Sequence, residues 1–123
     1  MDIDIIIPIY NAFDFVKKCI ETVIEHTDLT QHTLLLVNDK STDERILPLL
    51  NSFIKENQSL NIILIDNKDN QGFVRTVNIG MQYSHHDVVL LNSDTEVTRN
   101  WLSKIQNCAY RKPAVATVTP LSN

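Results

Sequence analysis

An alternation of short apolar runs with helix-patterned segments constrains the fold of this chain more than any other feature. The expected strands are Ile3–Ile9, Thr33–Val37, Asn61–Asp66, residues 87–92 and Ala114–Val118. Between them, apolar residues recur every three or four positions, as on the buried face of a helix. Strands that alternate with helices are typical of a parallel sheet covered on both faces. The sequence therefore predicts an α/β fold: three-layer α/β/α, with a mostly parallel, Rossmann-like sheet.

The expected helices differ in how clearly they begin and end. Asn11 is placed to cap the first helix and Thr98 the fourth, while Pro113 is expected to end the fourth. Pro48 requires the second helix either to start near it or to kink, and we favour a short first turn followed by the main helix. The inward faces are expected to carry Ala12, Val16, Cys19, Ile20, Val23 and Ile24; Ile46, Leu50, Phe53 and Ile54; Val74, Val77 and Met81; and Trp101, Leu102, Ile105, Cys108 and Ala109.

Composition excludes several classes of protein. The 123 residues suit one domain, and no apolar run approaches the roughly 20 residues of a membrane span. The formal net charge of -4 disfavours a general nucleic-acid binder, which needs a basic face. Two cysteines and a start without a basic signal segment predict a reduced, cytoplasmic protein. With only Gly72 and Gly80, the chain lacks a dinucleotide fingerprint and a Walker loop.

Polar residues follow each of the first four expected strands. They are Tyr10 and Asn11, Asn38 and Asp39, Asp66 and Asn67, and Asn92 and Asp94. The carboxyl ends of parallel strands share one edge of the sheet, and ligands of open α/β sheets bind at that edge. We therefore expect these residues to form one polar crevice.

The stretch from Val88 to Val97 carries the leading metal candidate. Its apolar half predicts a strand buried on both faces, in the middle of the sheet, and its polar half ends in two carboxylates. Asp94 is the expected ligand of a hard divalent cation, Mn²⁺ or Mg²⁺, with Asn92 and Glu96 as possible helpers. Such a cation can hold a diphosphate at the same time. The alternative is an ordinary polar turn that caps the next helix.

Asp39 is the second candidate. A carboxylate only accepts hydrogen bonds, so Asp39 suits a base with a ring N–H, such as uracil, thymine or guanine. The alternative is that Asp39 caps the following helix, although Ser41, Thr42 and Asp43 are better placed for that. Tyr10 either stacks on a base or covers the strand edge, and the sequence favours neither.

The start of the third helix is a candidate phosphate site. Asn70, Gly72 and Asn78 surround it, and free amides and the helix dipole favour an anion there. Arg75 offers a charge-assisted contact, although taken alone it is better explained as part of a solvated helix face. The four histidines, His26, His32, His85 and His86, lack metal-ligand spacing and are assigned no role.

Four motifs, in order, resemble the N-terminal nucleotide-binding part of inverting family 2 glycosyltransferases with the GT-A fold. They are the segments 5–11, 37–43, 70–73 with 78–80, and 90–95 with Trp101-Leu102. The resemblance implies that Pro8, Tyr10 and Asn11 line the nucleotide site and that Asp39 binds the base. It also implies that Asp94 is the last carboxylate of the family's D-x-D metal motif. Asn92 stands where that motif has its first carboxylate, which lowers the charge of the site.

By this resemblance, residues 1–123 are expected to bind a nucleotide-diphosphate sugar of the UDP or dTDP type. The family's acceptor-binding half and catalytic base follow the D-x-D motif, so the base is expected beyond Asn123 and no catalytic residue is assigned within the chain. This chain alone is therefore expected to be inactive and prone to self-association. In a longer enzyme, the acceptor is expected to be a sugar or a lipid-linked molecule, in cell-surface polysaccharide synthesis at the inner face of the membrane.

Two other functions remain in view. One is a non-catalytic nucleotide-binding module of the same fold, which Asn92 keeps open. The other is a flavodoxin-like phosphoacceptor domain, which needs paired carboxylates after the first strand, where this chain has Pro8-Ile9-Tyr10-Asn11.

Overall fold

The computed structural model describes residues 2–110 and 117–118, which build a five-stranded parallel sheet with helices between the strands. The elements are β1 (Ile3–Ile9), α1 (Phe13–His26), β2 (Thr33–Asn38), α2 (Ile46–Glu56), β3 (Ile62–Asp66), α3 (Phe73–Tyr83), β4 (Asp87–Leu90), α4 (Trp101–Tyr110) and β5 (Thr117–Val118). Their order across the sheet is β3-β2-β1-β4-β5. The predicted alternation is confirmed.

Some predictions near the carboxyl end fall outside the described residues. These are the helix stop at Pro113, the first part of the expected fifth strand, residues 114–116, and Asn123, beyond which the catalytic base is expected. The inward orientation predicted for Ala109 falls outside them as well, because the side chain of Ala109 is not among those described. The position of the catalytic base therefore stays a prediction.

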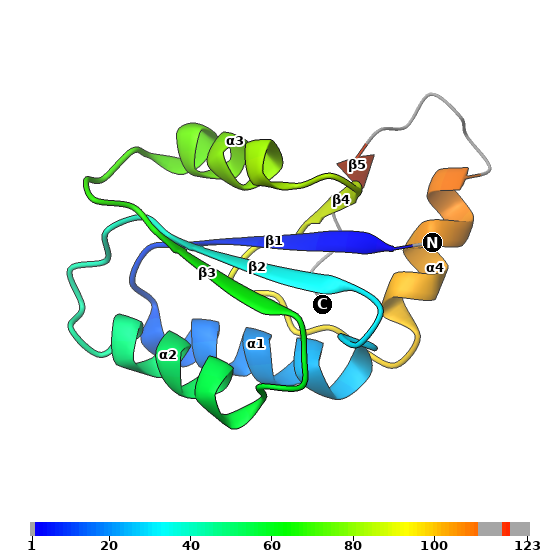
Figure 1. Cartoon of the computed structure of the whole chain (residues 1–123), viewed down its shortest axis with the longest axis horizontal. Helices are drawn as coiled ribbons and strands as arrows, with labels where there is room; N and C mark the ends of the chain where they lie inside the picture. Colours follow the sequence, from blue (N-terminus) through cyan, green and yellow to red (C-terminus); the bar gives the residue numbers. More distant parts are fainter. Residues whose placement is uncertain (1, 111–116, 119–123) are drawn as a thin grey trace.

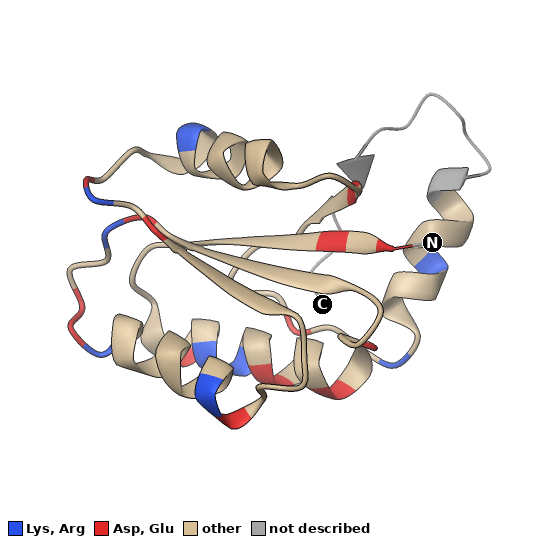
Figure 2. Ribbon diagram, in the orientation of Figure 1, with Lys and Arg blue, Asp and Glu red and all other residues tan. Residues whose placement is uncertain are grey.

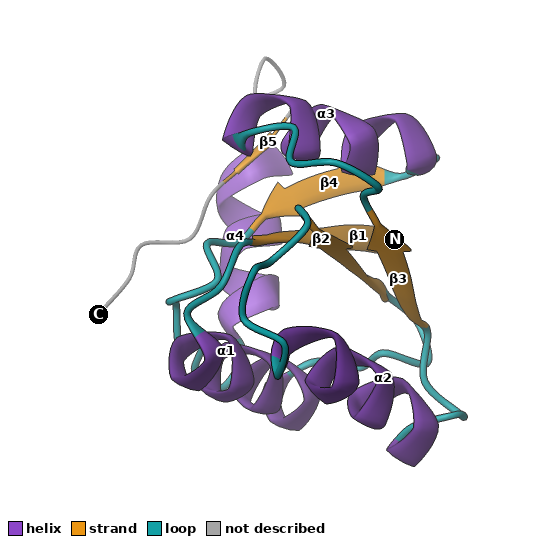
Figure 3. Cartoon of the chain, turned by 90° about the vertical axis from the view of Figure 1, so that its left-hand side faces the viewer, coloured by secondary structure: helices purple, strands orange, loops and turns teal. Residues whose placement is uncertain are grey.

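Helices cover both faces of the sheet, as Figures 1 and 3 show: α1 and α2 lie on one face and α3 on the other. At the start of α4, Trp101 and Leu102 join the core that α1 and α2 share with the sheet. The three-layer α/β/α prediction is therefore confirmed. Because all strands are parallel, their carboxyl ends share one edge, which faces the viewer in Figure 3.

The central strand β1 is buried along its whole length. Alternate side chains serve the two cores: Ile5 and Ile7 pack on the α1 side, and Ile6 packs on the α3 side. Gly80 lets α3 lie directly on β1, since a Cβ at that position would be 2.9 Å from Cγ2 of Ile6. The glycine in the 78–80 motif is thus explained by helix-to-sheet packing.

Two histidines satisfy polar groups near the start of β1. Nδ1 of His32 accepts the Ile3 amide at 3.1 Å, and burial lowers the pKa of His32, which favours the neutral ring. Asp4, buried within β1, accepts the hydroxyl of Ser84 and lies 3.2 Å from Nδ1 of His86. Both sites lie at the amino end of the sheet, away from the edge where the candidate ligands were expected.

Three inward-facing predictions are wrong, since Ala12, Val74 and Cys108 are all exposed. The buried stripe of α3 consists of Thr76, Val77 and Gly80, and Val74, on the side of the helix, is 69% exposed. Cys108 is exposed, because α4 meets the core mainly through its first turn, with Ile105 only partly buried. Cys19, by contrast, is fully buried as predicted.

The second helix starts near Pro48 as expected, whereas the starts of α1 and α4 depart from expectation. Pro48 is the third residue of α2, in the first turn, where an amide has no partner within the helix, so its missing N–H costs no helical bond. Thr98 does not directly precede α4; its carbonyl accepts the amide of Trp101, the first helical residue, at 3.1 Å. Ala12, with φ of 60°, occupies the N-cap position of α1 in place of Asn11.

Acidic and basic residues are interspersed on the outer faces of α1 and α2 (Figure 2). Within the part of the chain that the structure describes, no helix is both long enough and apolar enough to cross a membrane.

Candidate functional site

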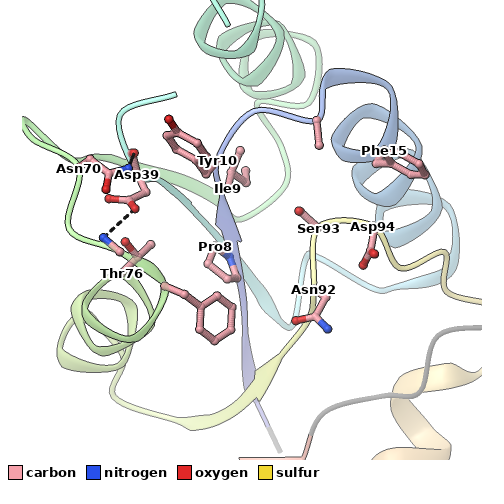
Figure 4. Close-up of a pocket in the computed structure, with 13 residues that line it drawn as sticks. Pro8, Ile9, Tyr10, Phe15, Asp39, Asn70, Thr76, Asn92, Ser93 and Asp94 are labelled. Carbon is pink, nitrogen blue, oxygen red and sulfur yellow. Dashed lines mark hydrogen bonds between the residues drawn. The ribbon is translucent and has the colours of Figure 1, made fainter. Parts of the chain in front are cut away.

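A cavity of about 690 Å³ opens at the carboxyl edge of the sheet (Figure 4). It is lined by Pro8, Ile9, Tyr10, Ala12, Phe15, Asp39, Asn70, Gly72, Phe73, Thr76, Asn92, Ser93 and Asp94. Its volume lies within the usual range for small-molecule sites. The end of β1 forms the middle of the wall, with Asp39 after β2 on one side and Asp94 after β4 on the other.

The carboxylate of Asp39 holds the loop that leads into α3. One oxygen accepts the Gln71 amide at 2.6 Å and Nδ2 of Asn67 at 3.1 Å, and the other accepts the Gly72 amide at 3.0 Å. Asp39 is 4% exposed, so these bonds form largely away from water. Asp39 therefore holds the residues just before α3, and no side-chain hydrogen bond caps α2, the helix that directly follows it.

The protonation state of Asp39 follows from these contacts. Burial alone would raise the pKa of its carboxyl group. The amide of Gln71, the side chains of Asn67 and Thr76 and the amide of Gly72 outweigh burial and hold this pKa below its ordinary value of 3.8. Asp39 is therefore an anion at neutral pH.

Other strand-end residues brace the loops and do not line the cavity. The side chain of Asn38 donates to Asp66 at 3.0 Å and accepts the Ser41 hydroxyl at 2.7 Å. Asn67, buried after β3, donates to Asp39 and to the Thr76 hydroxyl. The expected crevice thus exists, but Asn38, Asp66 and Asn67 support its walls.

Asn11 joins two loops at the rim of the cavity. Its Nδ2 donates to the Thr42 hydroxyl and its Oδ1 accepts the Asp43 amide, both at 2.9 Å. Its own amide donates to the Ser41 hydroxyl. The expectation that Asn11 caps α1 is wrong, because left-handed φ values of 55° and 60° at Asn11 and Ala12 turn the Asn11 side chain toward the 41–43 loop.

At the other side, Asn92, Ser93 and Asp94 present oxygen atoms to the cavity, and Asn92 and Asp94 are exposed. The Thr95 amide donates to the Asn92 carbonyl at 3.0 Å, which makes this stretch a tight turn. It does not cap a helix, since α4 begins only at Trp101. Beneath it, burial raises the pKa of Cys19 to about 12, helped by the nearby Asp94 and Glu96 carboxylates, so Cys19 remains a thiol.

Residues 4–122 match the sequence profile of glycosyl transferase family 2. The chain belongs to this family. It is 31% identical over 104 residues to polypeptide N-acetylgalactosaminyltransferase 11 of Xenopus tropicalis, covering 82% of this chain and 17% of that protein. It is 33% identical over 73 residues to poly(ribitol-phosphate) beta-glucosyltransferase of Bacillus spizizenii, covering 58% of this chain and 11% of that protein.

The fold agrees with this family 2 membership. The mannosyltransferase PcManGT of Pyrobaculum calidifontis, solved with GDP-Man and Mn²⁺, superposes with a TM-score of 0.78 at 18% identity. The match covers 94% of this chain and 33% of that chain. The chain thus spans between about a tenth and a third of the length of these relatives.

Three residues predicted to bind nucleotide in this family 2 chain lie outside the cavity lining: Asn11, Arg75 and Asn78. Arg75 and Asn78 are exposed on α3. Just before α3, Asp39 takes the Gln71 and Gly72 amides and places a negative charge beside the expected phosphate site, which stays a prediction. Pro8, Tyr10, Asp39, Asn70, Gly72, Asn92 and Asp94 do line the cavity.

Sequence reasoning missed several lining residues of the family 2 cavity, above all the aromatic side chains of Phe15 and Phe73. These are 62% and 57% exposed, each near the start of a helix that follows a strand end. An apolar residue that lies off the buried stripe, directly after a strand-end loop, was the available signal. Ile9, Ala12, Thr76 and Ser93 were missed as well.

Replacing Asp39 with Asn should destabilise the fold, because one acceptor oxygen becomes a donor and the amide that faces it loses its partner. We expect a loss of about 1–3 kcal/mol in the free energy of unfolding at pH 7, measured by urea denaturation. The difference between wild type and Asp39→Asn should shrink as the pH falls below about 3.8, since the low pKa of Asp39 makes its contribution depend on the ionised form.

Asp43→Asn is the matched control. Asp43 also accepts a backbone amide, that of Arg45, but this hydrogen bond is exposed to solvent and Asp43 is paired with the exposed Arg45 side chain. It should therefore lower stability far less. Equal losses from the two substitutions would show that Asp39 does not hold the 67–72 loop.

Proposed function

We propose that this chain is the sugar-nucleotide-binding part of a family 2 glycosyltransferase that moves a sugar from a nucleoside diphosphate to a hydroxyl group. The observation that carries the proposal is the cavity with Asp39 at one side and Asp94 at the other. A nucleotide sugar offers a base to the first and a diphosphate to the second. Family membership supports the reaction class.

The surroundings of Asp39 favour a base with a single N–H. A carboxylate has about four acceptor sites. Three are used by Asn67, Gln71 and Gly72, and the Thr76 hydroxyl also lies close enough to lower the pKa of Asp39. A hydroxyl group can rotate. One ring N–H of a base can therefore take the place of the Thr76 hydroxyl as a donor to Asp39, and the Thr76 hydroxyl can then donate to a carbonyl group of the base.

Uracil and thymine meet this condition, because each has one ring N–H between two carbonyl groups. Guanine presents two adjacent donors, and the second would find no free acceptor on Asp39. We therefore propose a UDP or dTDP donor. The mannosyltransferase PcManGT, with the same fold, was solved with GDP-Man, so the fold by itself leaves the base open.

The residues beside Asp94 fit a divalent cation that binds together with the diphosphate. Among the residues that the structure describes, no group of three or more His, Cys, Asp or Glu side chains is arranged to hold a metal ion. Asp94, Asn92 and Ser93 nevertheless supply oxygen donors on one wall, and diphosphate oxygens suit the remaining positions. When bound, Mn²⁺ or Mg²⁺ would neutralise charge on the leaving diphosphate.

The chain's own residues would then orient the donor. Asp39 holds the base, Tyr10 covers it from the end of β1, and Asp94 fixes the diphosphate end. The lining carboxylates are thereby both engaged, so we propose that the general base acting on the acceptor hydroxyl comes from sequence beyond Asn123.

The acceptor is the least constrained part of the proposal. The Bacillus spizizenii relative is named for glucosylation of poly(ribitol-phosphate), and the Xenopus tropicalis relative for transfer to polypeptides. We propose a sugar or lipid-linked acceptor in surface polysaccharide synthesis. Asn92, in place of a carboxylate, also favours a second candidate, a nucleotide-binding module without transfer activity.

The base assignment is tested with nucleotides of equal charge. We expect UDP and dTDP to bind about tenfold or more tightly than CDP and GDP, since leaving one donor or acceptor unpaired costs about 1–3 kcal/mol. Cytosine has the size of uracil but no ring N–H at that position, so CDP is the matched comparison. Isothermal titration with Mn²⁺ present gives the affinities. Equal affinities for UDP and CDP would show that Asp39 does not bind the base.

The metal assignment is tested by the gain in UDP affinity when Mn²⁺ is added. Asp94→Ala should abolish this gain without unfolding the chain, because Asp94 is exposed and lies in a turn outside any helix or strand. Asn92→Asp should increase the gain by adding a second carboxylate. Glu96, a possible helper by sequence, lies outside the cavity lining, so Glu96→Gln should keep the wild-type gain and serves as the control. A gain that survives Asp94→Ala would exclude Asp94 as the ligand.

A further inference from the structure

The segment that carries Asn92 and Asp94 has no regular secondary structure from Leu91 to Asn100. Its own backbone supplies few restraints: Leu91 donates to the Ile6 carbonyl at 2.9 Å, and Thr95 donates to the Asn92 carbonyl. A loop of this kind needs contacts from outside to keep a ligand oxygen in one place.

Helix α1 supplies such contacts on both sides of Asp94. Before it, the Cys19 thiol approaches the Asn92 carbonyl oxygen with an S···O distance of 3.7 Å. After it, the Val97 amide donates to the Thr22 hydroxyl oxygen at 3.1 Å, and that hydroxyl donates to the Cys19 carbonyl at 2.8 Å. A single hydroxyl group therefore joins the helix backbone to the end of the loop.

These contacts lie away from water. Thr22 is 9% exposed and Val97 is 6% exposed. A water molecule does not readily replace the hydroxyl, so the Val97 amide depends on Thr22 for its hydrogen bond. Buried amides are nearly always paired, and a change at Thr22 should therefore move the backbone at Val97.

We propose that Thr22 is a positioning residue that sets the place of Asp94 in the cavity. This inference rests on the proposed metal role of Asp94. Thr22 does not line the cavity, and it acts through the Val97 amide, three residues after Asp94. Asp94 itself is exposed, so its geometry depends on where the two ends of the loop are held.

The experiment measures the gain in UDP affinity on adding Mn²⁺, together with the melting temperature, for Thr22→Val and Thr22→Ser. Valine keeps the shape of threonine and loses the hydroxyl, whereas serine keeps the hydroxyl. We expect Thr22→Val to reduce the metal-dependent gain about tenfold, the lower range for loss of a group that orients a metal ligand. Binding of UDP without metal should change little, and Thr22→Ser should retain the gain.

Ile62→Val, a buried substitution in β3 at the far edge of the sheet, is the control for destabilisation alone. It should lower the melting temperature and keep the gain. If Thr22→Val does not fold, Thr22→Ala takes its place, since it brings no methyl group against the Val97 amide.

The outcomes separate the two proposals. A wild-type chain without any metal-dependent gain would overturn the metal role of Asp94, and the role of Thr22 with it. A wild-type gain that Thr22→Val or Thr22→Ala retains in full, despite a lower melting temperature, would show that Thr22 only stabilises the fold.

Discussion

The hydrogen bonds of the Asp39 carboxylate are the interaction on which the cavity depends. They join the end of β2 to the residues just before α3. Without them the Gln71 and Gly72 amides would lack these partners, and the 67–72 loop would keep the bonds from the Asn67 amide to the Asn38 carbonyl and from the Asn70 side chain to the Asp39 carbonyl. The cavity of this family 2 member is thus built around a carboxylate that is first a structural group. The proposed contact with a base uses only the hydrogen-bond acceptor site of Asp39 that the loop leaves available.

The opposite wall is built differently. Asp94 lies on an exposed turn whose ends are held by α1, so this wall depends on contacts made through the backbone at Asn92 and Val97. Backbone with positive φ occurs at the ends of β1 and β2, at Asn11, Ala12 and Lys40, and also at Asn100 just before α4. Left-handed conformations cost energy for residues other than glycine and tend to occur at functional sites. Here they turn the chain sharply at the ends of β1 and β2, which opens space above Pro8 and Tyr10.

Most of the fold could be predicted from the sequence, because strands and helices alternate with clear periodicity. It failed where one residue has two plausible uses. Asparagine is a common helix cap, yet the side chain of Asn11 hydrogen-bonds to residues 42 and 43. This contact depends on two residues in the left-handed conformation. Val74 and Cys108 fit a helical pattern but lie beyond the part of each helix that meets the core. Tertiary packing decides which use such a residue has, and this packing cannot be predicted from the local spacing of residues.

The candidate site was partly foreseeable for a related reason. Strand-end carboxylates and amides predicted the correct edge of the sheet, and Asp39 and Asp94 do line the cavity. What spacing could not show is that Asp39 bonds to amides thirty-two and thirty-three residues away, or that Asn67 supports it from the next strand. Phe15 and Phe73 belong to none of the expected inward faces, and local spacing does not show that their exposed rings line the cavity.

The most direct measurement is a crystal structure of this chain with UDP and Mn²⁺. We expect the uracil ring N–H to donate to Asp39 beside Thr76, with the ring against Tyr10, and the diphosphate and the metal ion to lie beside Asp94. A nucleotide bound in the reverse direction, with its base beside Asp94, would overturn the proposed function of the cavity, as would a metal ion held with no contribution from Asp94.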